Sequence, residues 1–395
     1  MTNPLMAYAW GSRGGIAALQ GRGPSGGPEA ELWMGAHPQA ASVLEHGGRL
    51  DALVEAAPAR VLGAEVVVRF GVRLPFMLKV LSAAEPLSLQ VHPDDALARE
   101  RFDGEEATGI DRGAPDRSYR DPYAKPEMLV AITDFQVLLG FRPAVEAADA
   151  LHRLGIQALS GVASALRGGA PTGEAFLTIV DWPVARRREL VAEVRAGAVT
   201  SDDPRAPWLV FLADRYPDDP GVAGVVLLNY VRLHDGQGVY VAPGQIHAYL
   251  QGTGVEILGG SDNVVRGGLT PKHVAVGELR RVLSCEAVPP SIIEPVACGD
   301  GEEMWITPRP EFALSRLRLD DSTREFAVSQ PQILLCIEGK VEVGAADVRV
   351  VLGGGESAFV TADTGPVTAS GRGVLLRATP GRTVALERPA TRSEA

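Results

Sequence analysis

The sequence predicts a mainly β fold that is interrupted by a block of helices. Residues 87–92 and 245–249 alternate strictly between polar and apolar side chains, which is the period of a β-strand. Short β-rich runs bounded by Gly and Pro fill the first and last thirds of the chain, whereas residues 143–233 place apolar residues at helical spacing. We therefore expect two β-barrels of the same kind, with a helical domain inserted in the sequence of the first.

The bulk composition limits the class of protein. The chain has 395 residues and a net charge of −11, from 38 Lys and Arg against 49 Asp and Glu. Because single cores rarely grow past about 250–300 residues, several domains are expected. The acidic balance argues against nucleic acid and anionic membranes as partners, and no stretch approaches the ~20 apolar residues of a membrane span. Three cysteines without a C-x-x-C pair fit a reduced, cytoplasmic protein.

The first third reads as short strands and loops. A β-branched run at 66–68 and an apolar block at 74–81 are typical of strands. A short helix is expected from Asp94 to residue 101, with the aspartate as its N-terminal cap. The charged, Gly-rich residues 103–121 predict a surface loop.

The remaining elements follow from the same patterns. Residues 143–154 and 183–196 are expected to be helices, and residues 333–343 a hairpin that turns at Glu338 and Gly339. The closing residues 389–395 are expected to be disordered. The predicted division is 1–142 and 234–283 for a first barrel in two parts, 143–233 for a helical domain and 284–395 for a C-terminal barrel.

A candidate metal site emerges from the two alternating segments. Gln90 and His92 share one strand face, and His247 lies on the polar face of the other strand. Glu127 heads a further apolar strand. Two nitrogen and two oxygen ligands suit zinc with one open position, although two histidines and a carboxylate also fit non-haem iron or manganese. Since no histidine follows residue 273, any metal belongs to the first barrel.

A Gly-flanked charged loop adds a possible anion site. Residues 259–273 carry Asp262, Arg266 and Lys272. The two cations suit a phosphate group or a developing oxyanion.

At this point several motifs carry a resemblance to a known family. They are YAWG at 8–11, LWMGAHP at 32–38, LSLQVHPD at 87–94, KPEM at 125–128, GQIHAY at 244–249 and RGGLTPKH at 266–273. In this order they resemble the type I mannose-6-phosphate isomerase family of the cupin superfamily. The likeness runs from residue 8 to about residue 283, and the last hundred residues resemble the family's C-terminal barrel only in general character.

The resemblance implies two cupin-type jelly-roll barrels, a helical insertion and one Zn²⁺ per chain in the first barrel. It assigns the zinc to Gln90, His92, Glu127 and His247. It places Arg266 at the reaction centre, and it lines the pocket with Trp10, Lys125, Tyr249, Glu256 and Asp262. Ser88 and Lys272 would hold a substrate phosphate. The implied partner is a small sugar phosphate, and we expect a monomer.

The implied reaction interconverts mannose 6-phosphate and fructose 6-phosphate through a cis-enediol, which requires a base and a stabilised oxyanion. Asp262, Glu256 and Lys125 are the candidate bases. Ala124 departs from the family, which usually has a histidine there, so ring opening falls to another group, the open chain is captured from solution, or catalysis is slow. The alternatives are an iron-dependent cupin oxidoreductase and a non-catalytic sugar-phosphate-binding cupin.

Overall fold

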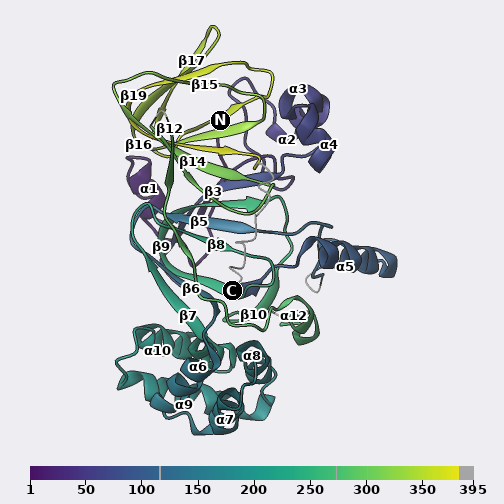
Figure 1. Cartoon of the computed structure of the whole chain (residues 1–395), viewed down its shortest axis with the longest axis vertical. Coiled ribbons are helices and arrows are strands. Elements are labelled where there is room, and N and C mark those ends of the chain that lie inside the picture. Colours follow the sequence, from purple (N-terminus) through teal and green to yellow (C-terminus); the bar gives the residue numbers. More distant parts are fainter. Residues whose placement is uncertain (115–116, 273, 300, 382–395) are drawn as a thin grey trace, which may run out of the picture.

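The computed structural model describes residues 1–114, 117–272, 274–299 and 301–381. It is an elongated molecule with three tiers: a β-barrel at one end, a second β-barrel in the middle and a bundle of helices at the other end (Figure 1). The expected mainly β fold with two barrels and a helical insertion is confirmed. No helix in the described ranges has the length and apolar character needed to cross a membrane.

The middle tier, called here the first barrel, is built around one long strand, β9 (His247–Gly259). It pairs antiparallel with β3 (Phe76–Ala83) and β5 (Glu127–Ala131), and its first part also pairs with β4 (Leu89–Val91) and β6 (Phe135–Phe141). The other strands of this sheet are β1 (Leu5–Met6), β2 (Glu31–Met34), β7 (Leu228–Leu233), β8 (Gly238–Val241), β10 (Val265–Gly268) and β11 (Ile292–Ile293). β9 therefore brings together segments that are far apart in sequence.

The first third holds more helix than the sequence predicts. Its helices are α1 (Gly15–Leu19), α2 (Leu50–Ala56), α3 (Pro58–Leu62), α4 (Ala64–Phe70) and α5 (Asp95–Thr108). The run at 66–68, interpreted as a strand, lies in α4. Its residues follow a helical period there, because Val66 is buried while Val68 is 86% exposed.

The α5 helix begins as predicted and ends later. The Asp94 side chain accepts a hydrogen bond from the Leu97 backbone amide at 2.8 Å, which is the expected cap. The helix then continues to Thr108, so the loop predicted from residue 103 is wrong over its first part. The acidic residues that suggested a loop bind the segment that follows the helix: Glu105 accepts from the Tyr119 amide, and Glu106 pairs with Arg117.

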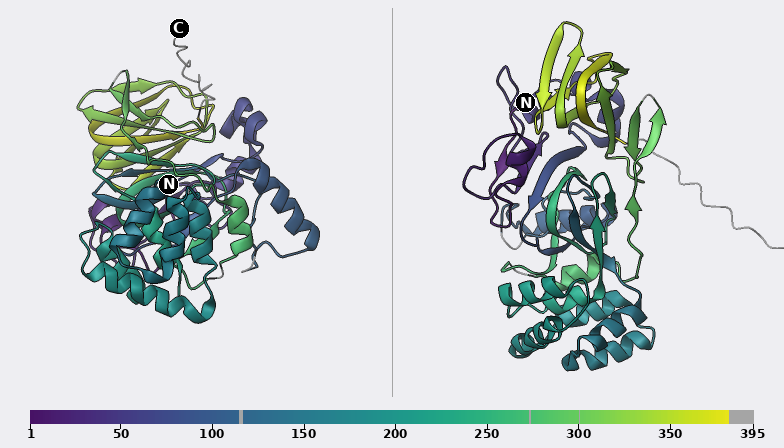
Figure 2. Two further views of the ribbon diagram at one scale, coloured as in Figure 1. Left: turned by 60° about the horizontal axis from the view of Figure 1, so that its bottom comes forward. Right: turned by 90° about the vertical axis from the view of Figure 1, so that its left-hand side faces the viewer.

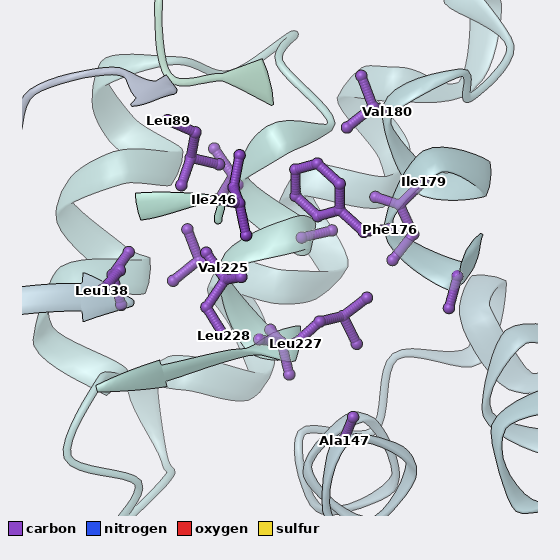
Figure 3. Packing of buried hydrophobic residues seen from close by; sticks show 14 of the residues in the cluster. Leu89, Leu138, Ala147, Phe176, Ile179, Val180, Val225, Leu227, Leu228 and Ile246 are labelled. Carbon is purple, nitrogen blue, oxygen red and sulfur yellow. The ribbon is translucent and has the colours of Figure 1, made fainter. Parts of the chain in front are cut away.

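The helical bundle packs on the outer face of the first barrel. Its elements are α6 (Ala144–Arg153), η1 (Gln157–Leu159), α7 (Ser160–Arg167), α8 (Thr172–Val180), η2 (Val184–Arg186), α9 (Arg187–Val199), α10 (Ala206–Arg215), α11 (Gly221–Gly224) and η3 (Val225–Leu227), which confirms the two helices expected from sequence. Leu89 and Ile246 from the barrel lie against Phe176 and Val225 of the bundle (Figure 3). The apolar faces of the two alternating segments are thus covered by helices, and their polar faces turn into the barrel.

The second barrel comprises the strands of the end tier, β12 to β19, and α12 (Val276–Val282) precedes it. Its strands are β12 (Val296–Gly299), β13 (Glu302–Trp305), β14 (Ala313–Asp320), β15 (Arg324–Phe326), β16 (Gln332–Ala345), β17 (Val348–Gly353), β18 (Ser357–Val360) and β19 (Val367–Thr379). The predicted hairpin at 338–339 is wrong, because β16 runs straight through it. A bulge between Cys336 and Glu338 and a positive φ of 73° at Gly339 bend the strand without reversing it. The predicted disordered residues 389–395 lie outside the described residues.

The two barrels share one hydrophobic core. Leu335 and Leu376 of the second barrel belong to the same buried cluster as Phe76, Val80 and Ile257 of the first. The N-terminus adds polar contacts between them, since the Met1 ammonium group donates to the Ser357 carbonyl at 2.9 Å. The second barrel therefore packs against β3 and β9, and the views in Figure 2 show the two barrels side by side.

Candidate metal centre and active site

Three buried side chains converge inside the first barrel. His92 Nε2 lies 3.3 Å from Glu127 Oε1, and His247 Nε2 lies 3.2 Å from Glu127 Oε2. Both imidazoles are fully buried, and Glu127 is 2% exposed. Within the described part of the chain, His92 Nε2, His247 Nε2 and Glu127 Oε2 have no hydrogen-bond partner. Buried polar atoms without partners are costly, so their convergence indicates a bound cation.

The other nitrogen of each imidazole is held by the backbone. His92 Nδ1 lies 2.7 Å from the Asn263 carbonyl oxygen, and His247 Nδ1 lies 3.1 Å from the Gln245 carbonyl oxygen. Each Nδ1 therefore carries the proton and donates it, which leaves the lone pair of Nε2 free toward the centre. Burial lowers the pKa of His92 to about 4, so this imidazole is neutral and able to bind a metal. Such a donor set fits zinc.

Glu127 is kept ionised by a neighbouring lysine. Lys125 Nζ lies 2.9 Å from Glu127 Oε1. Burial alone would raise the pKa of Glu127, but the charge of Lys125 and contacts with the two histidines outweigh it and hold the pKa well below the usual range. A carboxylate at this position is the form that binds a cation.

A row of directly opposed residues crosses the sheet beside the metal centre. Trp33 on β2 faces Lys79 on β3, Lys79 faces Glu256 on β9, and Glu256 faces Leu129 on β5. Lys79 Nζ lies 3.6 Å from Glu256 Oε2 and also 3.6 Å from an oxygen of Glu31. Burial lowers the pKa of Lys79, but these two carboxylates outweigh it and raise the pKa overall.

Glu256 has the most distinctive titration in the site. It is 3% exposed. Burial and the nearby Glu127 raise its pKa to about 7, although Lys79 and Lys125 act in the opposite direction. A carboxyl group with this pKa exchanges protons readily near neutral pH.

Three cations, Arg120, Arg266 and Lys272, lie close enough for their charges to shift a neighbour's pKa, and Arg266 is opposite Gln90 on the neighbouring strand. The pKa of Lys272 is lowered by Arg266 first, then by burial and Arg120. Burial and the charge of Arg120 lower the pKa of Arg266. None of these side chains forms an ion pair within the residues that the structure describes. The chain is acidic overall, so an unpaired cationic group of this kind marks an anion site.

Asn263 fixes the loop that carries Arg120. Its side chain is fully buried. Its Oδ1 accepts from the Arg120 amide at 2.7 Å, and its Nδ2 donates to the Asp121 carbonyl at 2.7 Å and the Tyr123 carbonyl at 3.0 Å. Because the Asn263 carbonyl accepts a hydrogen bond from His92 Nδ1, Asn263 connects the loop of Arg120 to the metal centre.

Comparison with known proteins places this geometry in a family. Residues 1–144 match the family described as phosphomannose isomerase type I, catalytic domain, and residues 302–380 match the mannose-6-phosphate isomerase cupin domain. The mannose-6-phosphate isomerase of Escherichia coli is 35% identical over 95% of this chain and 98% of its own length. Mannose-6-phosphate isomerase 1 of Arabidopsis thaliana is 30% identical over 85% of this chain and 81% of its own. The chain belongs to the type I mannose-6-phosphate isomerase family.

Solved structures agree with this membership. The mannose 6-phosphate isomerase of Salmonella typhimurium bound to fructose 6-phosphate and zinc superimposes with a TM-score of 0.90 at 33% identity, over 96% of this chain and 98% of that one. A zinc-bound holo form matches equally well. The protein is accordingly a zinc-dependent aldose–ketose isomerase, as the motifs predict, and the oxidoreductase and the non-catalytic binding protein are not favoured.

The structure brings most of the isomerase residues named from sequence into one place. His92, Glu127, His247 and Lys125 are in direct contact. Gln90 on β4 pairs with His247 on one side and Arg266 on the other. Of the remaining predicted residues, Tyr249 packs beside His247 with ring centroids 5.9 Å apart, and Asp262 bonds to His37. Trp10 stacks on Tyr8, Ser88 is half-buried just before β4, and Lys272 is exposed; within the described part of the chain, none of these three forms a hydrogen bond or ion pair with the metal centre.

Sequence reasoning gave no role to Lys79, Asn263, His37 or Arg120. A signal for Lys79 was present, since it is the one charge inside the apolar block 74–81. His37 lies in a matching motif at 32–38. Arg120 lay in a segment interpreted as a surface loop, and only the tertiary structure shows that its backbone bonds to Asn263 and that its charge lies near Arg266 and Lys272.

Proposed function

We propose that the isomerisation of mannose 6-phosphate to fructose 6-phosphate takes place against His92, Glu127 and His247, which hold the zinc together with Gln90. The observation that carries this is the convergence of three buried donor atoms without partners. Gln90 is the fourth ligand because its strand position is opposite His247. When bound, zinc polarises the sugar oxygens and so acidifies the adjacent C–H bond.

Glu256 is the proposed base that moves the proton between C1 and C2. It is almost fully buried, and the register of β5 and β9 places it on the same face of the sheet as Glu127. Its pKa of about 7 suits proton transfer in both directions. Lys125 is occupied by its ion pair with Glu127 at 2.9 Å, and Asp262 bonds to His37 at 3.0 Å. Both are therefore weaker candidates for this step.

Charged and aromatic groups are proposed to hold the rest of the substrate. Arg266 lies on the strand next to Gln90, where its fixed charge stabilises the enediolate oxygen. Lys272 and Arg120, with Ser88, bind the phosphate group, and Trp10 and Tyr249 line the sugar pocket. Binding the phosphate holds C1 and C2 against the base.

A coupled assay for fructose 6-phosphate tests the activity. Zinc-loaded protein is expected to convert mannose 6-phosphate, to lose activity with a chelator and to regain it with zinc. Absence of turnover in protein with one zinc per chain would reject this substrate.

The cytoplasmic location, the monomeric state and the absence of a nucleic-acid partner stay predictions. Light scattering coupled to size exclusion would report a mass near 41.7 kDa for a monomer. A mass of twice this value at micromolar concentration would contradict it.

A further inference from the structure

The helical bundle reaches the segment that carries Lys272 through one carboxylate. Asp219 lies in the turn between α10 and α11 and is half-buried. Its Oδ1 accepts a hydrogen bond from the Gly221 amide at 2.8 Å, and its Oδ2 accepts one from the Thr270 amide at 3.2 Å. One oxygen thus bonds to the start of α11, and the other bonds to the segment that follows β10. Asp219 therefore ties the bundle to a segment of the first barrel.

The two segments approach each other closely at a pair of glycines. The β10 strand lies at the end of the first barrel that faces the bundle (Figure 1). A Cβ atom added to Gly221 would lie 2.8 Å from the Gly268 Cα, whereas carbon atoms in favourable contact are about 3.5–4.0 Å apart. The absence of side chains at both positions lets the Asp219 carboxylate come within hydrogen-bond distance of the backbone beyond β10.

The backbone that Asp219 holds has an unusual conformation. Leu269 has a φ of 57°, in the left-handed region that bulky residues seldom adopt. Its side chain is 1% exposed and belongs to the core that the bundle shares with the first barrel. Such a conformation persists only where the surrounding contacts impose it. The hydrogen bond from the Thr270 amide to Asp219 is one of these contacts.

Thr270 extends this restraint to Lys272. The Thr270 hydroxyl oxygen accepts a hydrogen bond from the Lys272 amide at 3.1 Å, while the Thr270 amide itself donates to Asp219. The Lys272 side chain is exposed and lies near enough to Arg266 for that charge to lower its pKa. The backbone of Lys272 is thus held by hydrogen bonds, and its ammonium group faces solvent next to another cation.

A carboxylate is better suited to this position than a neutral side chain. It has two acceptor oxygens and no donor, so it can accept from the bundle and from the barrel segment at the same time. Hydrogen bonds to an ionised acceptor are also stronger than those between neutral groups. Burial raises the pKa of Asp219, whereas hydrogen bonds from the Gly221, Thr270 and Leu269 amides and the charge of Arg187 oppose this change.

We propose that Asp219 is a positioning residue for substrate binding, which holds Lys272 in place for the substrate phosphate through the backbone of residues 268–272. It acts through Lys272 rather than on the substrate. The helical bundle thereby contributes to phosphate affinity from outside the barrel. This inference rests on the proposed function, in which Lys272 binds the phosphate group.

Kinetics and phosphate binding of zinc-loaded Asp219→Asn test this role. The variant keeps the size of the side chain but replaces one acceptor oxygen with a donor, so it can no longer accept from both amides. KM for mannose 6-phosphate should rise roughly 10-fold with little change in kcat, because the phosphate site is misplaced while the reaction centre is intact. The Kd of inorganic phosphate, measured by calorimetry, should rise by a similar factor.

A double-mutant cycle separates positioning from a merely structural role. If Asp219 acts through Lys272, Asp219→Asn should have little further effect on KM when Lys272→Gln is already present. A structural effect would multiply KM by the same factor in both backgrounds. The neighbouring Asp218 provides a matched control, since it is 61% exposed and pairs with Arg188 at 2.6 Å. Asp218→Asn should leave KM and phosphate affinity unchanged.

Zinc content and thermal unfolding establish that each variant is folded. If Asp219→Asn does not fold, Thr270→Val carries the test, because it removes the hydroxyl that orders Lys272 and keeps the amide that bonds to Asp219.

An unchanged KM in Asp219→Asn, or the same factor in both backgrounds of the cycle, would overturn the proposal. An unchanged KM in Lys272→Gln would reject the proposed phosphate site and this inference with it. A wild-type protein that binds inorganic phosphate but forms no fructose 6-phosphate would reject the proposed function alone, since the Kd of phosphate still tests Asp219.

Discussion

Lys79 and Glu256 face each other across β3 and β9, with the lysine Nζ 3.6 Å from the carboxylate Oε2. Glu31 flanks the same lysine at 3.6 Å. Lys79 is therefore one cation between two buried carboxylates. Its charge opposes the effect of burial on Glu256, whose pKa would otherwise lie above about 7.

Removing the charge of Lys79 should change the pH dependence of turnover. If Glu256 acts as a carboxylate, the rate falls as the pH drops below its pKa of about 7. Lys79→Gln removes a contribution that lowers this pKa, so the acidic limb of kcat should move to higher pH. Lys340, which is exposed, provides the control Lys340→Gln. If the acidic limb of the kcat profile has the same pKa in Lys79→Gln as in the wild type, that limb reports the titration of a group other than Glu256.

Zinc binding should depend on His247 but not on an exposed histidine. His247→Asn removes a proposed ligand from the buried centre, so zinc content should fall well below one per chain after dialysis. His234 is 71% exposed, and His234→Asn should keep the wild-type zinc content. Metal analysis by mass spectrometry measures both. Full zinc occupancy in His247→Asn would show that the ion lies elsewhere.

Arg120 should contribute to substrate affinity. A charge-assisted bond to phosphate is worth about 1.5–3 kcal/mol, so Arg120→Gln should raise KM for mannose 6-phosphate by roughly 10–100-fold and weaken its dependence on salt. Arg112, which pairs with Glu106 on the surface, offers the control Arg112→Gln. Initial-rate kinetics at two ionic strengths would decide, and an unchanged KM would remove Arg120 from the phosphate site.

Asn263 should matter for stability as well as for activity. Asn263→Ala leaves the Arg120 amide and the Tyr123 carbonyl without their buried partner. Unsatisfied buried groups cost about 1–3 kcal/mol each, so the free energy of unfolding should fall by at least about 2 kcal/mol. Urea denaturation measures this change. A loss below about 0.5 kcal/mol would mean that water replaces the side chain.

The shared core should make the two barrels unfold together. Leu335 is fully buried in the cluster that joins them, and Leu335→Ala should cost about 2–5 kcal/mol. Calorimetry should show one lowered transition for both barrels. A wild-type transition for the first barrel alongside an early transition for the second would refute a common core.

The sequence predicted the metal centre better than its surroundings. The convergence of His92 and His247 could be predicted because alternation on a strand fixes which side chains share a face, and the structure places both beside Glu127. Gln90 shares that face, and its role as a ligand stays a prediction. The run at 66–68 was wrongly predicted to be a strand because β-branched residues have only a small energetic preference against the helix. The burial of Val66 in α4 outweighs that preference. The prediction of a hairpin at Gly339 was wrong because a glycine with positive φ occurs both in turns and in β-bulges. Arg120 and His37 gained their roles from contacts with residues more than 140 positions away, which no local pattern reports.

The helical bundle has one consequence for how the catalytic strands are held. Leu89 and Ile246, neighbours in sequence of Gln90 and His247, are buried in one cluster with Phe176 and Val225 of the helical bundle (Figure 3). The helical insertion therefore restrains the two short strand segments by covering their apolar faces, while their polar faces stay available for a metal ion. Substitutions on the solvent-facing sides of these helices should leave the reaction unaffected. Loss of a single methylene from a side chain packed against Leu89 or Ile246 should instead shift Gln90 and His247, although the substituted residue does not contact them.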